Sequence, residues 1–364
     1  MADPIRAKIA LSGLSPYIGR LEASRARELI LTLSNPGETI YDPFCGSGTI
    51  PLEAWAAGRH SICGDRNPYA VAISLGKLHP PSTLNDAINA LDAVDKSTQI
   101  AKRAVDLRKV PLWVREFFHN ETLREAIAWS TALRKHREHF LFGCFLNIIH
   151  HQRPGFLSYP ASHVTPYLRA AKFPITDFPE MYEKRDVRSR LEKKVRRTLK
   201  QDIPFCYGLG RKVALRGAEQ PLAQPETVDC IITSPPYMSE LDYARDNRLR
   251  LWFCGVNDWK SLDNVISPGR EPFLRLMSQC IISWERLLKP GGHVALVLGD
   301  SRRSGSSRVD IPKLVIEVIK QKSAALKLLD IQTSELPDLS RVIKGKTGTL
   351  FESTIILKKQ EAPC

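Results

Sequence analysis

The chain has 364 residues, of which 43% are hydrophobic and 25% are charged, a composition typical of a globular protein. This length is sufficient for one large domain, or for a domain that carries a substantial insertion. No apolar run reaches about 18 residues, and the N-terminus leads into no signal-peptide pattern, so we predict neither a membrane span nor a secretory signal. The net charge of +14 favours a polyanionic partner, of which nucleic acid is the commonest.

The eight cysteines are scattered along the chain and form no Cys-x-x-Cys pair. Several lie in apolar, strand-like runs, as Cys230 does within residues 228–232. This pattern predicts reduced, buried thiols, with no metal site and no disulfide framework. Together with the lack of a secretory signal, it predicts a cytoplasmic protein.

The first part of the chain alternates between predicted helices and strands. Hydrophobic spacing and helix breakers predict helices at 22–33, 49–57 and 68–78, and strands at 39–42 and 60–65. The two strands end in Asp42 and Asp65, and a glycine-containing turn follows the first of them. This order is typical of the opening of a doubly wound α/β sheet.

The middle of the chain, from about 84 to 210, predicts helices and proline-punctuated loops without strands, with helices at 114–134 and 140–150. The sheet then resumes, and the predicted elements are strands at 212–215, 228–233 and 293–298, helices at 273–288 and 311–321, and a closing hairpin of strands at 326–333 and 353–357. We therefore predict one α/β domain formed by residues 1–83 and 211–364, with residues 84–210 as a basic, helical insertion.

A basic segment, residues 184–200, lies at the end of this insertion and holds nine basic and two acidic residues, half of the chain's excess charge. Apolar residues recur in it at steps of four from Val187 to Leu199, which predicts a helix with one buried stripe and a charged outer face. The side chains that we predict to bind nucleic acid are Arg188, Lys193, Lys194, Arg196 and Arg197.

The first sequence motif is Asp42-Pro43-Phe44-Cys45-Gly46-Ser47-Gly48-Thr49, directly after a predicted strand. Its two glycines allow the backbone to pass close to a ligand, and the next helix N-terminus faces the same crevice at the carboxyl edge of the sheet. Asp65 ends the neighbouring strand, where a carboxylate can accept hydrogen bonds from a ribose diol. A lone Gly-x-Gly is usually a plain turn, but this string followed by Gly64-Asp65-Arg66-Asn67-Pro68 is a far more specific signal of a ligand site.

The second motif, Thr233-Ser234-Pro235-Pro236-Tyr237, follows another buried strand and therefore lies at the same edge of the sheet. Consecutive prolines fix their φ angles and remove two backbone donors, which leaves rigid carbonyl groups. An exocyclic amino group is a poor nucleophile because its lone pair is delocalised into the ring. The Ser234 hydroxyl and the Pro235 carbonyl can each accept one amino hydrogen and turn the lone pair toward a methyl donor, while Tyr237 stacks on the base.

Together, the two motifs resemble those of the DNA amino-methyltransferases, which act on cytosine N4 or adenine N6. The resemblance covers roughly residues 14–80 and 212–358, and residues 14–21 look like the family's N-terminal motif, which lies over the methionine moiety of the cofactor. It implies a seven-stranded methyltransferase sheet with an antiparallel last strand, S-adenosylmethionine as the cofactor, and double-stranded DNA with a flipped target base as the partner. The insertion is then a candidate target-recognition region.

The resemblance also implies the roles of individual residues. Those implied to bind the cofactor are Tyr17, Asp42, Phe44, Cys45, Gly46, Gly48, Thr49, Asp65 and Asn67. Those implied to form the catalytic loop are Ser234, Pro235, Pro236 and Tyr237. Whether a cognate restriction enzyme accompanies the chain is left open by the sequence.

Some positions depart from the family's pattern. Family members often carry an acid after a glycine where the third strand ends, and this acid contacts the adenine end of the cofactor. Here the nearest match is Arg216-Gly217-Ala218-Glu219, which makes Glu219 a substitute candidate. Residues 242–248 line the pocket of a flipped base or cap a helix, two alternatives that stay open, and Asp300 is a second-tier site candidate because it follows a later strand.

Serine at position 234 favours cytosine N4 as the target, because the serine form of the motif is commoner among the N4 enzymes. An adenine-N6 DNA methyltransferase stays open, as does an RNA methyltransferase acting on guanine N2 or adenine N6, because residues 42–53 also resemble the RNA guanine-N2 enzymes. A different class is a non-catalytic nucleic-acid-binding protein on the same fold, and the intact motifs argue against it.

Overall fold

The computed structural model describes residues 10–17, 19–151, 155–160, 174–200, 205–236, 243–267, 269–300, 309–335 and 351–361. Contacts between Cα atoms divide the chain into two compact units. The sheet unit comprises Tyr17–Ser74, Phe205–Tyr243 and Lys260–Cys364, and the helical unit comprises Met1–Pro16, Leu75–Pro204 and Ala244–Trp259. The helical unit thus draws on three segments of the chain, of which the longest contains most of the predicted insertion. Which unit performs catalysis and which recognises a target stays a prediction.

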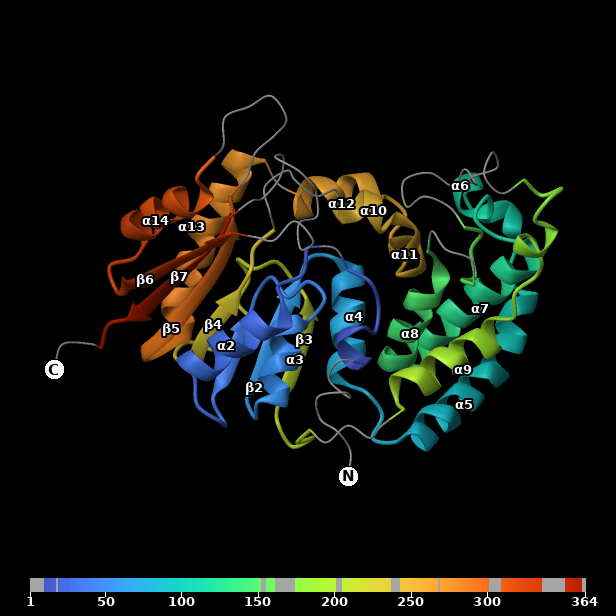
Figure 1. The fold of residues 1–364 in the computed structure, drawn as a ribbon, viewed down its shortest axis with the longest axis horizontal. Helices are drawn as coiled ribbons and strands as arrows, with labels where there is room; N and C mark the ends of the chain where they lie inside the picture. Colours follow the sequence, from blue (N-terminus) through green and yellow to red (C-terminus); the bar gives the residue numbers. More distant parts are fainter. Residues whose placement is uncertain are drawn as a thin grey trace. The chain divides into compact units, whose positions relative to one another are not determined.

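Seven strands of the described residues form one sheet in the order β3-β2-β1-β4-β5-β7-β6 (Figure 1). Their bounds are β1 (Thr39–Asp42), β2 (His60–Asp65), β3 (Arg211–Leu215), β4 (Val228–Thr233), β5 (Leu288–Gly299), β6 (Leu326–Glu335) and β7 (Phe351–Lys359). The first five strands pair in parallel, whereas β7 is antiparallel to both β5 and β6. The predicted fold class, a mostly parallel, doubly wound sheet with an antiparallel last strand, is confirmed.

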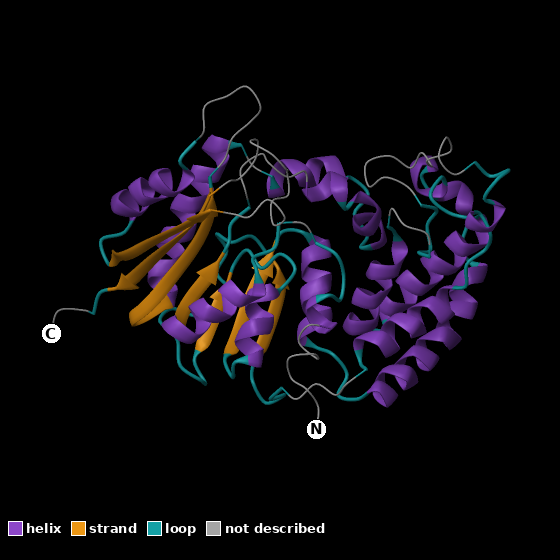
Figure 2. Cartoon of the chain, in the orientation of Figure 1, coloured by secondary structure: helices purple, strands orange, loops and turns teal. Residues whose placement is uncertain are grey.

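Helices cover both faces of the sheet (Figure 2). Alternation along β4 sends Cys230 and Ile232 into one buried cluster and Ile231 into the other. The first cluster also takes side chains from α2 (Ala23–Leu33) and α3 (Thr49–Ala56), and the second takes them from α13 (Arg270–Leu287) and α14 (Ile311–Lys322). The two apolar faces of each central strand are thus buried, as a parallel sheet requires.

The helical unit is built from α5 (Leu84–Arg103), η1 (Leu107–Lys109), α6 (Leu112–Arg115), α7 (Asn120–Lys135), α8 (His139–Ile149), η2 (Pro179–Met181), α9 (Val187–Thr198) and α11 (Arg248–Phe253). A capping box fixes the start of α5, because Thr83 and Asp86 exchange side-chain to backbone hydrogen bonds. Three further helices, α4 (Pro68–Leu78), α10 (Tyr243–Asp246) and α12 (Trp259–Ile266), contain a boundary between the units. None of the described helices is long and apolar enough to cross a membrane.

Two element predictions are wrong in detail. The single helix predicted at 114–134 is divided into α6 and α7, and His119 caps the second by accepting a hydrogen bond from the Glu121 amide. The strand predicted at 293–298 begins earlier, at Leu288, because Leu288 already pairs with Val228 before the register shifts. The described cysteines are free thiols, and the buried ones are Cys45, Cys63, Cys144, Cys230 and Cys280.

Candidate functional site

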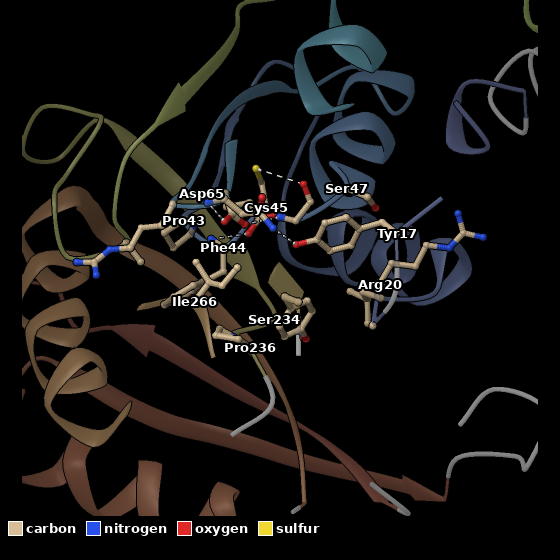
Figure 3. Close-up of a pocket in the computed structure, with 18 of the residues that line it drawn as sticks. Tyr17, Arg20, Pro43, Phe44, Cys45, Ser47, Asp65, Ser234, Pro236 and Ile266 are labelled. Atoms are coloured by element: carbon tan, nitrogen blue, oxygen red, sulfur yellow. Dashed lines mark hydrogen bonds between the residues drawn. The ribbon is translucent and has the colours of Figure 1, made fainter. Parts of the chain in front are cut away.

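A pocket of about 810 Å³, part of it open to solvent, lies in the sheet unit where four neighbouring strands end (Figure 3). Both sequence motifs contribute to its walls: Asp42 ends β1, residues 43–47 and Thr49 follow it, and Ser234 and Pro236 follow β4. The remaining lining residues are Tyr17, Gly19, Arg20, Leu21, Ile50, Asp65, Arg66, Asn67, Ala218, Tyr243, Val265, Ile266 and Leu276. The structure thus brings together in one pocket most of the residues that the sequence implicates.

The loop after β1 needs glycine at two positions. Gly46 and Gly48 have φ angles of +47° and +73°, in the left-handed region that favours glycine. A Cβ atom at Gly48 would also lie 2.7 Å from the Ser74 hydroxyl oxygen. Gly48 precedes the first residue of α3 but is not among the lining residues, so its place is in the turn itself. Ser74, which sequence reasoning missed, donates a hydrogen bond to the Gly46 carbonyl at 3.2 Å and fixes the same turn.

Asp65 joins this loop to the end of β2. Its Oδ2 accepts a hydrogen bond from the Gly46 amide at 2.9 Å, and its Oδ1 accepts one from the Asn67 amide at 2.8 Å. Burial raises the pKa of Asp65 to about 6, although these backbone hydrogen bonds act in the opposite direction. Each carboxylate oxygen has a second lone pair, so Asp65 can hold the loop and still accept hydrogen bonds from a ligand in the pocket.

Asp42 connects the two motifs directly. Its Oδ1 accepts a hydrogen bond from the Thr233 hydroxyl at 2.6 Å and a longer one, of 3.3 Å, from the Phe44 amide. Thr233 is the last residue of β4 and precedes Ser234, so this bond ties the end of β1 to the start of the second motif. Asp42 is buried, and this burial raises its pKa to about 7.

Aromatic residues close one side of the pocket. Tyr17 stacks on Tyr243 with the ring centroids 6.2 Å apart, and its hydroxyl accepts a hydrogen bond from Asn67 Nδ2 at 3.5 Å. Burial raises the pKa of Tyr17 well above its ordinary value, so its hydroxyl is protonated at neutral pH. Tyr17, Arg20 and Ser47 lie on one side of the pocket in Figure 3, and Asp65 lies on the other.

The second motif reaches the pocket through Ser234 and Pro236. Pro235 is buried and is not among the lining residues, whereas Tyr237 lies outside the described residues. Within the segment 242–248, Asp242 also lies outside them, and Tyr243 lines the pocket. Asp300 does not line it; its amide and Oδ1 hydrogen bond to the Phe351 backbone and join β5 to β7.

The basic segment forms α9, and its predicted apolar stripe is buried. Two of its predicted nucleic-acid contacts have structural partners instead. Lys194 is only 5% exposed and donates a hydrogen bond to the Gly13 carbonyl at 3.1 Å, so the prediction that its charge faces DNA is corrected. Arg188 forms ion pairs with Asp92, Asp95 and Glu192.

The outer face of α9 keeps the remaining predicted side chains. Lys193, Arg196 and Arg197 are exposed, as is Lys200 just beyond the helix. Arg196 pairs with Glu192 at 2.7 Å but its side chain is still 53% exposed. These four cations and Lys184, which pairs with Glu125 before the helix begins, are the exposed cations of the basic segment.

One segment of the chain matches the model of a known protein family. Residues 23–75 match a family model described as DNA methylase, the N6/N4 methyltransferase family. No curated protein sequence matches the chain.

Among solved structures, the chain is similar to TrmN from Thermus thermophilus, with 13% identity over 99% of this chain and 54% of that chain, and a TM-score of 0.40. It thus spans about half the length of TrmN. An S-adenosylmethionine-dependent methyltransferase from Methanosarcina mazei gives 12% identity over 92% and 98% of the two chains, with a TM-score of 0.38. The rRNA methyltransferase AviRa from Streptomyces viridochromogenes gives 12% identity over 94% and 87%, with a TM-score of 0.32. None of these likenesses is close enough to indicate a substrate.

The matched segment contains the glycine loop, Asp65 and Asn67, which carried the first half of the resemblance seen in the sequence. The resemblance seen in the sequence is therefore confirmed over this segment, which matches the N6/N4 DNA methylase family model.

Proposed function

We propose that this chain transfers a methyl group from S-adenosylmethionine to the exocyclic amino group of a flipped DNA base, and that this group is N4 of cytosine. The observation that carries the proposal is that one pocket is lined by both the glycine loop with Asp65 and the Ser-Pro-Pro motif. A cofactor site and an amino-positioning site within the same pocket satisfy the proximity that a direct transfer needs.

The residues of the pocket fit S-adenosylmethionine. Gly46 lines the pocket with backbone atoms alone, and a Cβ atom there would lie 3.4 Å from the Tyr17 ring, which lines the same pocket. Asp65 has lone pairs for a ribose diol, and the Asp42 carboxyl lines the same pocket, where a cationic ligand would favour its ionised form. When bound, this cofactor supplies an electrophilic methyl group on a positively charged sulfur.

The roles proposed for the second motif rest on its chemistry and on its place directly after β4. The Asp42–Thr233 hydrogen bond fixes the backbone that leads into Ser234. Ser234 then accepts an amino hydrogen of the target base, which orients the nitrogen lone pair for in-line attack, and the Pro235 carbonyl is the second proposed acceptor. Tyr237 is proposed to hold the extruded base by stacking.

The proposed DNA contact outside the pocket is formed by Lys193, Arg196 and Arg197 on the outer face of α9 and by Lys200 just beyond its end. Four exposed cations within the eight residues 193–200 suit the phosphate backbone, which supplies affinity without sequence information. The buried stripe of α9 fixes the helix that carries the first three of these side chains.

The mechanism is tested by Ser234→Ala, with Ser61→Ala as a matched control because Ser61 is buried in β2 and does not line the pocket. We expect Ser234→Ala to reduce single-turnover methyl transfer to DNA by at least tenfold, with an affinity for S-adenosylmethionine close to that of the wild type. Full transfer activity in Ser234→Ala would refute the role of the serine, and equal losses in both variants would indicate a general effect on folding.

A further inference from the structure

Arg66 occupies a position in the pocket that has no role in the proposed function. It directly follows Asp65 and lines the pocket, and its side chain is 38% exposed. Its Nη2 forms an ion pair with Oε1 of Glu219, the residue considered above as a contact of the adenine end. Glu219 itself is not among the lining residues, whereas its neighbour Ala218 is. The cation, and not the acid, therefore faces the ligand space.

The order of the strands indicates which part of the cofactor lies near Arg66. The sheet edge runs from β4 through β1 and β2 to β3, so the lining residues run from Ser234 through Phe44 and Asp65 to Ala218. Methyl transfer must occur beside Ser234, and the ribose lies at Asp65 in the proposed function. The adenine then extends beyond β2 toward β3, to the place where Arg66 and Ala218 line the pocket.

The ion pair of Arg66 and Glu219 is held tightly in place. Leu215 pairs with Asp65, and the Arg216 amide donates to the Asp65 carbonyl at 3.0 Å, so the end of β3 is fixed beside Arg66. A Cβ atom at Gly217 would lie 2.5 Å from Arg66 Nε and 2.5 Å from both carboxylate oxygens of Glu219. The ion pair thus fills the space that any other residue at position 217 would need.

We propose that Arg66 is the residue that contacts the adenine of the cofactor, through its planar guanidinium, and that Glu219 is a positioning residue that holds this plane. A guanidinium stacks on an aromatic ring, and a carboxylate partner fixes its orientation. On this account, Glu219 does not read the exocyclic amino group of adenine. The inference rests on the proposed function, because it assigns one end of the same cofactor site.

The test is calorimetric binding of S-adenosylmethionine, 5′-methylthioadenosine and 5′-methylthioinosine, in which the exocyclic amino group of adenine is replaced by oxygen. The variants are Arg66→Ala, Glu219→Gln and both together, with Arg216→Leu as the control because Arg216 is exposed and does not line the pocket. Thermal unfolding of each variant distinguishes a weakened cofactor site from a destabilised fold.

We expect Arg66→Ala to bind S-adenosylmethionine and methylthioadenosine roughly three- to thirtyfold more weakly than the wild type, in the range of cation–π interactions. Glu219→Gln should weaken binding by about threefold, and it should have no further effect when Arg66 is already alanine, as expected of a residue that acts through another. The wild type should bind methylthioinosine within about threefold of methylthioadenosine.

Three results would overturn the inference. They are wild-type affinity in Arg66→Ala, additive effects of the two substitutions, and a loss of about tenfold or more for methylthioinosine that Glu219→Gln abolishes, which would show that Glu219 reads the amino group. A wild-type protein that binds neither S-adenosylmethionine nor methylthioadenosine would refute the proposed function and this inference together. A wild-type protein that binds both, with unchanged affinity in Arg66→Ala, would refute this inference alone.

Discussion

Asp42→Asn tests whether the pKa of the carboxyl group that joins the two motifs is raised as much as its burial implies. Burial raises its pKa from 3.8 to about 7, so the folded protein binds a proton at Asp42 that the unfolded chain releases. A carboxyl with a raised pKa contributes stability that is present below its unfolded value and is lost as the pH rises through the folded value. Each pH unit between the two values corresponds to about 1.4 kcal/mol, which gives a full effect of about 4 kcal/mol.

The assay is urea unfolding of the ligand-free wild type and Asp42→Asn between pH 5 and pH 8. Asparagine can still accept the Thr233 hydrogen bond, but it carries no titrating proton. As the pH rises from 5 to 8, the wild type should lose about 2–3 kcal/mol of unfolding free energy that the variant does not lose. Glu28→Gln, which removes an exposed carboxyl of an i,i+3 pair, is the control. Parallel pH curves for the wild type and Asp42→Asn would refute the reasoning.

Three further predictions follow from the site and from α9. Asp65→Ala should weaken S-adenosylmethionine binding about tenfold to a hundredfold by calorimetry, because it removes a charged acceptor and loosens Gly46, and wild-type affinity would remove Asp65 from the site. Gly48→Ala should lower the free energy of unfolding by roughly 1–3 kcal/mol, because φ is +73° and the new Cβ meets Ser74; unchanged stability in urea would contradict the turn geometry. Replacing Lys193, Arg196 and Arg197 with Gln should flatten the slope of log K for DNA against log salt by about 0.9 for each phosphate that α9 no longer neutralises. The charge control is Lys320→Gln with Lys322→Gln on α14. Equal slopes in the wild type and the α9 variant would mean that the outer face of α9 contacts only solvent.

Much of the sheet can be predicted from the sequence because its strands have clear ends. The strand predicted at 60–65 has the same bounds as β2, since a glycine and a proline frame these residues and Asp65 closes the run. The motif residues after β1 and β4 are predicted to meet because parallel strands present their carboxyl ends at one edge. Local sequence signals therefore predict both these strands and the sheet edge at which the two motifs meet.

Other lining residues carry no comparable signal. Val265 and Ile266 lie on α12, and Leu276 on α13, far from either motif in the sequence, and their apolar side chains look like those of any amphipathic helix. Tyr243 enters the sequence prediction only as part of two alternatives, because nothing in residues 242–248 shows that its ring stacks on Tyr17. Tertiary packing, and not local pattern, brings these residues to the pocket.

The wrong prediction for Lys194 has a geometric cause. Steps of four from Val187 follow a single ridge of the helix, but an α-helix has 3.6 residues per turn, so the seventh and eleventh residues after Val187 also lie on its buried face. Those residues are Lys194 and Thr198, and both are buried. The sequence contains this information, and a prediction at the helical period would have separated Lys194 from Lys193 and Arg197.

The central claim is tested most directly by mass spectrometry of nucleosides from unmodified bacterial DNA treated with the full chain and S-adenosylmethionine that carries a labelled methyl group. The account predicts labelled N4-methylcytosine in this DNA and none in RNA from the same cells. Labelled N6-methyladenine in DNA would correct the target base and keep the mechanism of amino methylation. Label found only in RNA, or in no nucleoside at all, would contradict the claim that this chain is a DNA amino-methyltransferase.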